Sequence, residues 1–178
     1  MTRWRPGDRR ADTKSMLRVD QAGEYGATRI YAGQLAVLRR NCPEAKLVAR
    51  MASQEERHLK RFDALMAERR GRPTVLQPLW NVAGFALGAA TALMSEKAAL
   101  ACTDAVETEI DRHYGEQLRE LGQDDPELAA DIAEFRAEEL EHRDTAREAG
   151  AADALGYPLL TAAIRAGCRV AIGLSKRI

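Results

Sequence analysis

Apolar residues recur every three or four positions along most of the chain, which is the spacing of an α-helix with one buried face. Four long stretches show this pattern and end at helix breakers or capping residues: 12–40, 44–70, 96–121 and 126–149. A fifth, shorter stretch covers 158–176. The pattern therefore predicts an all-α protein in which four long helices pack together and a fifth follows them.

The connections between the predicted helices differ in length. Residues 41–43 join the first two helices, and residues 122–126 join the third and fourth, with Asp125 placed to cap and Pro126 at the first helical position. Such short links make each pair antiparallel neighbours. Residues 71–95 are far too many for a turn. This order of short, long and short connections is typical of the ferritin-like four-helix bundle, with 71–95 as an apolar crossover between its second and third helices.

Composition agrees with a single helical domain spanning residues 1–178. Only 5% of residues are aromatic and 30% are charged, which favours helices and excludes an all-β sandwich. Lys plus Arg and Asp plus Glu are both 27, and this zero formal net charge argues against a nucleic-acid partner. The three cysteines are far apart and lack a Cys-x-x-Cys pair, which excludes a zinc ribbon or disulfide framework and fits a reducing compartment. Residues 1–14 have no apolar run, so we expect a flexible segment and no secretory signal.

Six ionisable residues lie within the apolar stripes of the four long helices. The first and third helices each contribute one Glu, and the second and fourth each contribute a Glu-x-x-His motif. Residues three apart on a helix face the same way, so both members of a motif point in one direction. The six side chains should therefore meet in one core: Glu24, Glu55, His58, Glu107, Glu139 and His142.

Four converging carboxylates require compensating positive charge, because an unpaired buried carboxylate is strongly unfavourable. Two divalent cations would balance them, and carboxylate oxygens with imidazole nitrogens suit iron or manganese. The pattern also repeats, since 31 residues separate Glu24 from Glu55 and 32 separate Glu107 from Glu139. We therefore predict that the six residues are metal ligands. The alternative is a set of salt-bridged surface residues, which is the usual fate of a single Glu.

Neighbouring acidic residues test this assignment of faces. Glu134, Glu138 and Glu141 fall on a different stripe of the fourth helix, together with Asp131, and are expected to be solvated. Glu139→Ala should therefore lose metal while Glu141→Ala keeps it.

Three other residues are expected near the site without binding metal. His113 and Tyr114 are candidate catalytic residues in the layer around the ligands, with a satisfied core histidine and an ordinary core tyrosine as the alternatives. Tyr114 lies in line with Glu107 and could hydrogen-bond near the site. Asp20, one turn before Glu24, is a candidate partner for the free N–H of a ligating histidine.

Two segments outside the four long helices are unusually apolar. Residues 73–95 contain no charge, and 79–95 as a helix would measure about 25 Å, short of a hydrocarbon core of roughly 30 Å. We expect this segment to lie in or dip into one leaflet, and Gly84 and Gly88 form a small-x-x-x-small pair suited to close helix packing. The basic, amphipathic helix 158–176 suits an anionic membrane surface. The alternative is that both segments only cover the bundle.

A collinear set of short motifs covers nearly the whole chain after Ser15. It begins with Arg18-Val-Asp-Gln-Ala-Gly-Glu-Tyr-Gly-Ala27 and Arg29-Ile-Tyr-Ala-Gly33. The remaining motifs are Gln54-Glu55 with His58, Arg72-Pro-Thr-Val-Leu76, Pro78-Leu-Trp-Asn81, Gly84-Phe-Ala-Leu-Gly88, Ala101-Cys-Thr103, Glu138-Glu-Leu-Glu-His142 and Ala166-Gly-Cys-Arg-Val-Ala-Ile172. In this set the chain resembles the demethoxyubiquinone hydroxylase family.

The resemblance implies a di-iron monooxygenase of ubiquinone biosynthesis that hydroxylates the ring of a polyprenyl methoxy-methyl-benzoquinol. The implied iron ligands are the same six residues that helical periodicity brings together. The resemblance also implies two Fe ions per chain, dioxygen as co-substrate and a two-electron donor, expected to be NADH. No Gly-x-Gly-x-x-Gly follows a predicted strand, so the donor would act without a Rossmann site.

A polyprenyl quinol partitions into lipid, so we expect attachment to a membrane surface or one leaflet. The expected place is the cytoplasmic side of the cell membrane, or the matrix side of the mitochondrial inner membrane in a eukaryote. An accessory protein that presents the lipid and a homo-oligomer are further expected partners.

Two other functions use the same ligands. A ferroxidase or peroxide-scavenging ferritin-like protein would not need the uncharged crossover or the apolar final helix. A non-catalytic, membrane-associated binding protein with a structural metal would show no oxygen reactivity of its reduced metal pair.

Overall fold

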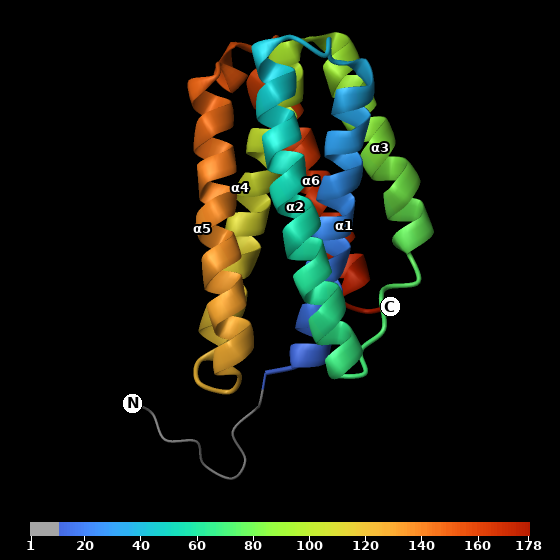
Figure 1. Cartoon of the computed structure of the whole chain (residues 1–178), viewed down its shortest axis with the longest axis vertical. Coiled ribbons are helices and arrows are strands. Elements are labelled where there is room, and N and C mark those ends of the chain that lie inside the picture. Colours follow the sequence, from blue (N-terminus) through green and yellow to red (C-terminus); the bar gives the residue numbers. More distant parts are fainter. Residues whose placement is uncertain (1–10) are drawn as a thin grey trace.

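A computed structural model describes residues 11–178 of the chain, and these residues are helical with no strand among them. This confirms the predicted all-α class. Of the segment 1–14 predicted to be flexible, residues 1–10 lie outside the described part, and Thr13 and Lys14 begin the first helix. The elements in chain order (Figure 1) are α1 Thr13–Val37, α2 Pro43–Glu68, α3 Gln77–Met94, α4 Glu96–Leu121, α5 Pro126–Glu148, the short 3-10 helix η1 Ala151–Asp153, and α6 Tyr157–Ser175.

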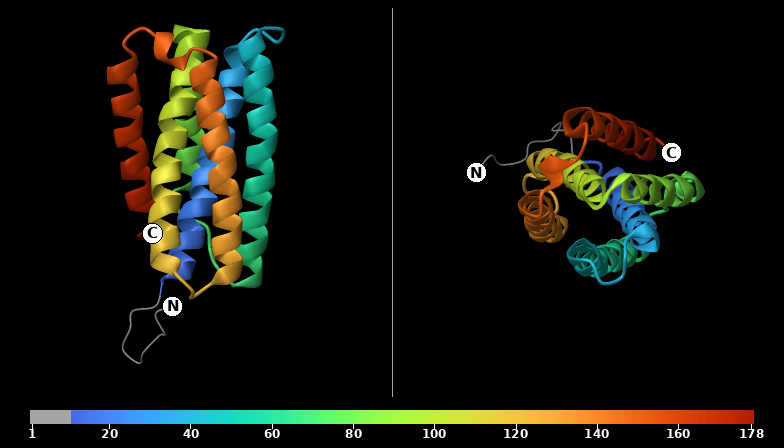
Figure 2. Two further views of the ribbon diagram at one scale, coloured as in Figure 1. Left: turned by 90° about the vertical axis from the view of Figure 1, so that its left-hand side faces the viewer. Right: turned by 90° about the horizontal axis from the view of Figure 1, so that it is seen from above.

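The helices α1, α2, α4 and α5 form a four-helix bundle, and α3 and α6 pack on its outside (Figure 2). The two predicted antiparallel pairs, α1 with α2 and α4 with α5, are in contact along the bundle. The helix α3 lies within the crossover that joins these pairs and packs against α1, while α6 packs against α4. The arrangement agrees with the ferritin-like bundle expected from the lengths of the connections.

The helix ends follow local signals, and the two largest differences from the sequence-based boundaries are at the ends of α1 and α2. Asp125 accepts a hydrogen bond from the Leu128 N–H and precedes Pro126, as predicted. The helix α1 ends at Val37, three residues early, because Leu38 is extended with ψ of 141°. The helix α2 ends at Glu68 because Arg70 takes a left-handed φ of 51°.

Glycines allow α3 to approach α1 very closely. A Cβ atom added at Gly88 would lie 1.9 Å from the carbonyl oxygen of Ile30, and one added at Gly33 would lie 2.1 Å from that of Phe85. No side chain fits at either position. The predicted role of Gly88 in close helix packing is thereby confirmed, and α3 is fixed along one face of α1.

Two apolar clusters fill the bundle at different heights. One contains Phe62, Leu65 and Ile132, near the end where α4 joins α5, and the other contains Val48 and Met51, near the end where α1 joins α2. The six predicted site residues come from the helical turns between these clusters. The packing thus places them at mid-height and away from both ends.

Candidate metal centre

The structure brings all six predicted residues together in the bundle interior, and each is at most 1% exposed. We call them the carboxylate–histidine cluster. Its donor atoms form two overlapping groups within which all atoms lie within 4.8 Å of one another. The groups share Glu55 and Glu139, and one adds Glu24 and His58 while the other adds Glu107 and His142. Two adjacent positions, with two carboxylates common to both, are the arrangement that a pair of metal ions requires.

The inner ring nitrogens of both histidines face the shared carboxylates. His58 Nδ1 lies 3.0 Å from Glu139 Oε1, and His142 Nδ1 lies 3.1 Å from both Glu55 Oε1 and Glu139 Oε2. The Nε2 atoms point outward, away from the centre of the cluster. Each imidazole can therefore offer Nδ1 to a metal and keep Nε2 for a hydrogen bond.

Several buried oxygens of the cluster have no hydrogen-bond partner among residues 11–178. They are both carboxylate oxygens of Glu55 and one oxygen each of Glu24, Glu107 and Glu139. Leaving buried acceptors unsatisfied is unfavourable, and native interiors rarely do so. Divalent cations would satisfy these oxygens, so the donor set fits a metal pair in both number and chemical type.

Burial controls the protonation of the carboxylates without metal. It raises the pKa of Glu55 well above its usual value, and the charges of Glu139 and Glu24 raise it further. Burial and the Glu139 charge likewise raise the pKa of Glu107 well above its usual value. Burial also raises the pKa of Glu24, but the nearby His58 and its positive charge outweigh burial, so the net pKa is lowered. The metal-free cluster therefore holds protons that a metal would displace.

The two histidines differ in pKa. Burial lowers the pKa of His58, but its contacts with Glu139 and Glu24 outweigh burial and raise the pKa to about 11. Burial lowers the pKa of His142 below its usual value. The metal-free cluster is thus charged mainly around His58.

Two tyrosines hold the unshared carboxylates. The Tyr114 hydroxyl donates to Glu24 Oε1, and the Tyr31 hydroxyl donates to Glu107 Oε1 at 2.7 Å. The expected hydrogen bond of Tyr114 near the site is present, although its acceptor lies on α1. The role of Tyr31 was not predicted from the sequence. The spacing of the tyrosines could have indicated this role, since Tyr31 and Tyr114 each lie seven residues after an unshared Glu.

The outer nitrogens of the histidines contact two residues that were not predicted from the sequence to lie at the site. His58 Nε2 lies 2.7 Å from Glu138 Oε2, and His142 Nε2 lies 3.1 Å from Gln54 Oε1. The prediction that Glu138 is solvated is wrong, because it lies between α5 and α2 and is only 21% exposed. Arg57 pairs with the same Glu138 oxygen.

The expected role of Asp20 is also wrong. Its carboxylate lies 3.4 Å from His113 Nε2, at the α1–α4 contact, whereas the outer nitrogens of both ligand candidates face the α2 and α5 side. His113 is outside both donor groups and 13% exposed, as expected of a residue that does not bind metal. Glu134 and Glu141 are exposed as predicted.

Comparison with known proteins places the chain in a family. A model of the family described as "Ubiquinone biosynthesis protein COQ7" matches residues 11–175. The chain belongs to this family. The resemblance identified from its motifs is thereby confirmed.

Relatives of this COQ7-family chain are named as hydroxylases. The "3-demethoxyubiquinol 3-hydroxylase" of Rhodospirillum rubrum is 57% identical over 162 residues, which cover 91% of this chain and 76% of the relative. The human "NADPH-dependent 3-demethoxyubiquinone 3-hydroxylase, mitochondrial" is 53% identical over 173 residues, covering 95% and 79%. The "5-demethoxyubiquinone hydroxylase, mitochondrial" of Saccharomyces cerevisiae is 44% identical over 179 residues, covering 92% and 77%.

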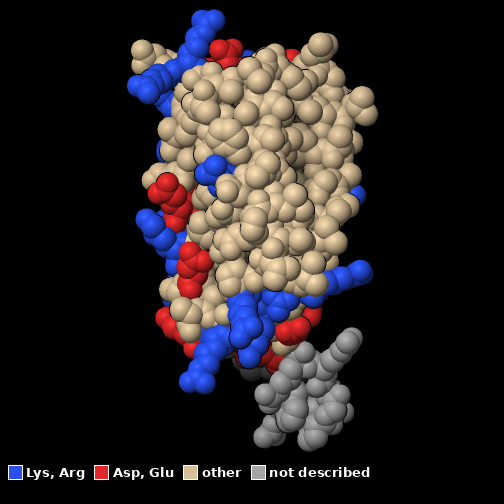
Figure 3. Space-filling view, turned by 90° about the vertical axis from the view of Figure 1, so that its right-hand side faces the viewer, with Lys and Arg blue, Asp and Glu red and all other residues tan. Residues whose placement is uncertain are grey.

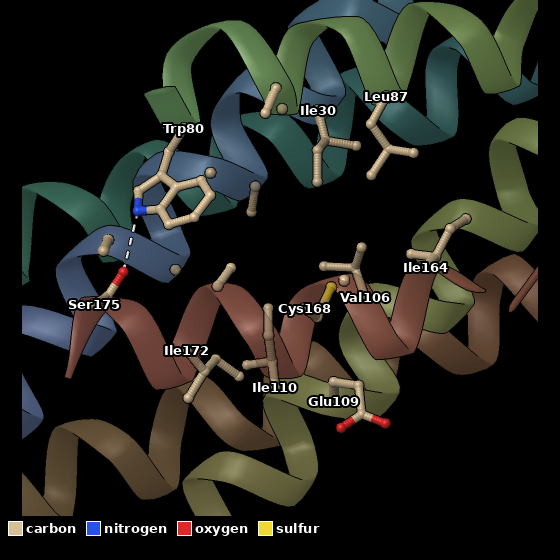
Figure 4. A pocket seen from close by; sticks show the side chains of 18 of the residues that line it. Ile30, Trp80, Leu87, Val106, Glu109, Ile110, Ile164, Cys168, Ile172 and Ser175 are labelled. Carbon is tan, nitrogen blue, oxygen red and sulfur yellow. Dashed lines mark hydrogen bonds between the residues drawn. The ribbon is translucent and has the colours of Figure 1, made fainter. Parts of the chain in front are cut away.

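A cavity of about 540 Å³ lies between α1, α3, α4 and α6 (Figure 4). Its walls are almost entirely apolar, and Glu109 is the one charged side chain among the described residues that line it. Trp80 Nε1 donates to Ser175 Oγ at 3.0 Å and joins α3 to α6 at one end of the cavity. A Cβ atom at Gly23 or Gly26 would meet nothing within 4 Å, so these glycines widen it.

The charged wall residue of this cavity is neutralised from outside. Arg112, Arg165 and Arg169 all bind the fully buried Glu109 carboxylate, with Arg165 Nε at 2.7 Å. Burial raises the pKa of Glu109, but the three arginines outweigh burial and lower it to about 2. This group was not predicted from the sequence, because arginines in an amphipathic helix are usually solvated.

The outer face formed by α3 and α6 carries few charged side chains, and Lys and Arg gather along its lower edge (Figure 3). We call it the apolar face. Its exposed residues include Leu79, Val82, Leu93, Met94, Leu159 and Val170. Within the described part, every helix is either too short or too polar to cross a bilayer.

Proposed function

We propose that this chain is a di-iron monooxygenase that hydroxylates the ring of a polyprenyl methoxy-methyl-benzoquinol, a demethoxyubiquinol. The observation that carries the proposal is the pair of four-residue donor groups sharing Glu55 and Glu139, buried inside a member of the COQ7 family. One iron would be held by Glu24, His58 and the shared carboxylates, and the other by Glu107, His142 and the shared carboxylates. The hydroxylase names of the relatives support this reaction and substrate.

When bound, two ferrous ions supply the electrons that let dioxygen place one oxygen atom on the ring while the other leaves as water. The residues of the chain hold and shield this chemistry. Tyr31 and Tyr114 orient the unshared carboxylates by donating hydrogen bonds to them. The apolar clusters above and below exclude water. Glu55 and Glu107, whose pKa values are raised by burial, release their protons to make room for the cations.

The cavity is the proposed site for the substrate. Gly23 and Val106 line it, and each immediately precedes a residue of the cluster, Glu24 or Glu107. The cavity and the cluster therefore occupy neighbouring faces of the same two helices, α1 and α4. An apolar space of this size suits the ring and the first part of a polyprenyl chain.

The apolar face is the proposed membrane contact. Its exposed residues would enter one leaflet, with the basic residues of its lower edge at the lipid headgroups. The substrate would then reach the cavity between α3 and α6 without crossing water. This supports a peripheral position on a membrane, whereas the cytoplasmic side of a cell membrane, or the matrix side of the mitochondrial inner membrane for a eukaryotic relative, stays a prediction. The accessory protein and the homo-oligomer stay predictions.

A nicotinamide nucleotide is the proposed electron source. NADH is the donor expected from the family resemblance, while the human relative is named NADPH-dependent. Residues 11–178 contain no strand, hence no βαβ unit that could bind a dinucleotide in the Rossmann manner. The reductant would therefore act by direct contact or through another protein.

Reconstitution tests this function. The protein is loaded with ferrous iron without oxygen, mixed with a short-chain demethoxyquinone and either NADH or NADPH, and exposed to ¹⁸O₂. We expect a hydroxylated ring that carries one ¹⁸O atom. A product whose oxygen comes from water contradicts the proposal, and iron oxidation without any ring product favours the ferroxidase alternative.

A further inference from the structure

The residue before the Glu of each Glu-x-x-His motif contacts the histidine of the other motif. Gln54 precedes Glu55 on α2 and lies 3.1 Å from His142 Nε2 on α5. Glu138 precedes Glu139 on α5 and lies 2.7 Å from His58 Nε2 on α2. The two motifs thus exchange partners across the α2–α5 contact, but one partner is a neutral amide and the other is a carboxylate.

The two donor groups have matched sets of donor residues. Each contains one histidine, the two shared carboxylates and one unshared Glu. Each unshared Glu accepts a hydrogen bond from a tyrosine, and that tyrosine lies seven residues after the unshared Glu of the other group. The groups differ in the charge of the residue that contacts the outer nitrogen of each histidine. This residue is the carboxylate Glu138 at His58 and the neutral amide Gln54 at His142.

A carboxylate and an amide have different effects on a ligating imidazole. When Nδ1 binds a metal, Nε2 carries the proton and donates it in a hydrogen bond. A carboxylate acceptor makes this bond charge-assisted and makes the imidazole a stronger donor to the metal. An amide oxygen accepts the same bond without that charge. Arg57 pairs with Glu138 but is half exposed, so water weakens its opposing effect.

We propose that Glu138 and Gln54 are positioning residues that make the two metal positions unequal, so that the position at His58 fills first and more tightly. The inference rests on the proposed function, which assigns the six residues as ligands. Partner residues of ligating histidines typically change metal affinity 10–100-fold. We therefore expect the dissociation constants of the two positions to differ by about tenfold or more.

Four proteins test the inference: the wild type, two single variants and the double variant. Each is titrated with Fe²⁺ without oxygen, and binding is measured by calorimetry and by the metal content per chain. The wild type should bind two ions in two unequal steps. Glu138→Gln gives both histidines an amide and should weaken the tighter step about tenfold, which narrows the gap between the steps. Gln54→Glu gives both a carboxylate and should tighten the weaker step, which also narrows the gap. The double variant restores one partner of each kind and should restore the gap.

The difference between the two dissociation constants distinguishes this inference from a general effect of charge and from damage to the fold. A general effect of charge would move both steps together and leave the gap unchanged in all four proteins, and damage to the fold would not be repaired by the second substitution. Glu141→Gln serves as the control, because it removes an exposed carboxylate from the same helix, α5. The cation paired with this Glu141 carboxylate, Arg50, is 4.0 Å away. The substitution should leave both steps unchanged.

The possible failures are distinguishable. A wild-type protein that binds no iron overturns the proposed function itself. Two equal steps in the wild type, or a gap unaffected by either single substitution, overturn only the inequality of the positions. Mössbauer spectra of protein loaded with one equivalent of ⁵⁷Fe add a second readout, in which the double variant should again show one dominant site and each single variant a mixture of two.

Discussion

The helices α1 and α4 have opposite chemistry on two of their faces. Toward α2 and α5 they contribute Glu24 and Glu107 to a closed, fully buried set of ionisable groups. Toward α3 and α6 they line an apolar cavity with residues such as Gly26 and Val106. One layer of two helices can thus separate the proposed metal centre, which needs converging carboxylates, from the proposed binding site of a lipid substrate, which needs the absence of charge.

The most severe test of this division removes a carboxylate shared by both donor groups. Glu139→Ala should reduce bound iron from two ions per chain to less than one and abolish hydroxylation, because Glu139 belongs to both groups. The matched control is Glu141→Ala on the same helix, which is exposed and should keep both ions. Iron content per folded chain decides the question. Equal losses in the two variants would refute the assignment of faces.

The second test addresses the apolar face. Val82 and Leu93 on α3 are 68% and 74% exposed. Substitution of either residue by Glu should abolish flotation with anionic liposomes while leaving the iron content unchanged. Leu87 is unsuitable for this purpose because it lines the cavity. Ala133→Glu, at an exposed position of α5, adds the same charge away from this face. If both kinds of variant float equally well, the face only covers the bundle.

A third test fills the cavity without touching the cluster. Gly26→Leu places a side chain where a Cβ meets nothing within 4 Å, so the helix should form normally while the space for substrate shrinks. We expect kcat/KM for a long-chain quinol to fall about tenfold or more, since about tenfold is the lower end of what one misfitting methylene costs in an apolar pocket, with two ions still bound. Gly173→Leu is the control on α6, since Gly173 does not line the cavity. Loss of iron in Gly26→Leu would show that the two regions are not separate.

The cluster could be predicted from sequence, whereas the cavity could not. Helical periodicity alone placed Glu55 and His58 on one inner face, because the 3.6-residue repeat determines which side chains share a direction. The same rule wrongly predicted a solvated Glu138, which lies beside the inner stripe. Its contact with His58 depends on how α2 packs relative to α5, which helical periodicity does not determine. The cavity results from small residues and from the separation of α3 and α6, neither of which leaves a periodic signal.

The smallest expected effect concerns pH, and it distinguishes the two regions by sign. Burial raises the pKa values of Glu55, Glu107 and Glu139 in the metal-free protein. A carboxyl group with a raised pKa in the folded state stabilises the fold below its unfolded pKa of about 4.3, and this stability is lost as the pH rises through the folded value. Glu109 beside the cavity has the opposite shift, to about 2, so its contribution is present above about 4.3 and is lost only in acid.

Thermal unfolding between about pH 5.5 and 8.5 should therefore report on the buried carboxyl groups whose pKa values are raised, and not on Glu109, since the Glu109 contribution is constant in this range. We expect the melting temperature of the metal-free protein to fall by several degrees as the pH rises. Iron binding requires the protons to leave, so the extra stability given by iron should grow over the same range. Glu55→Gln, which removes one of these titrating carboxyls, should flatten the slope of the metal-free protein. A melting temperature that rises with pH in the absence of metal would show that the buried carboxylates are ionised and that their charges are balanced in another way.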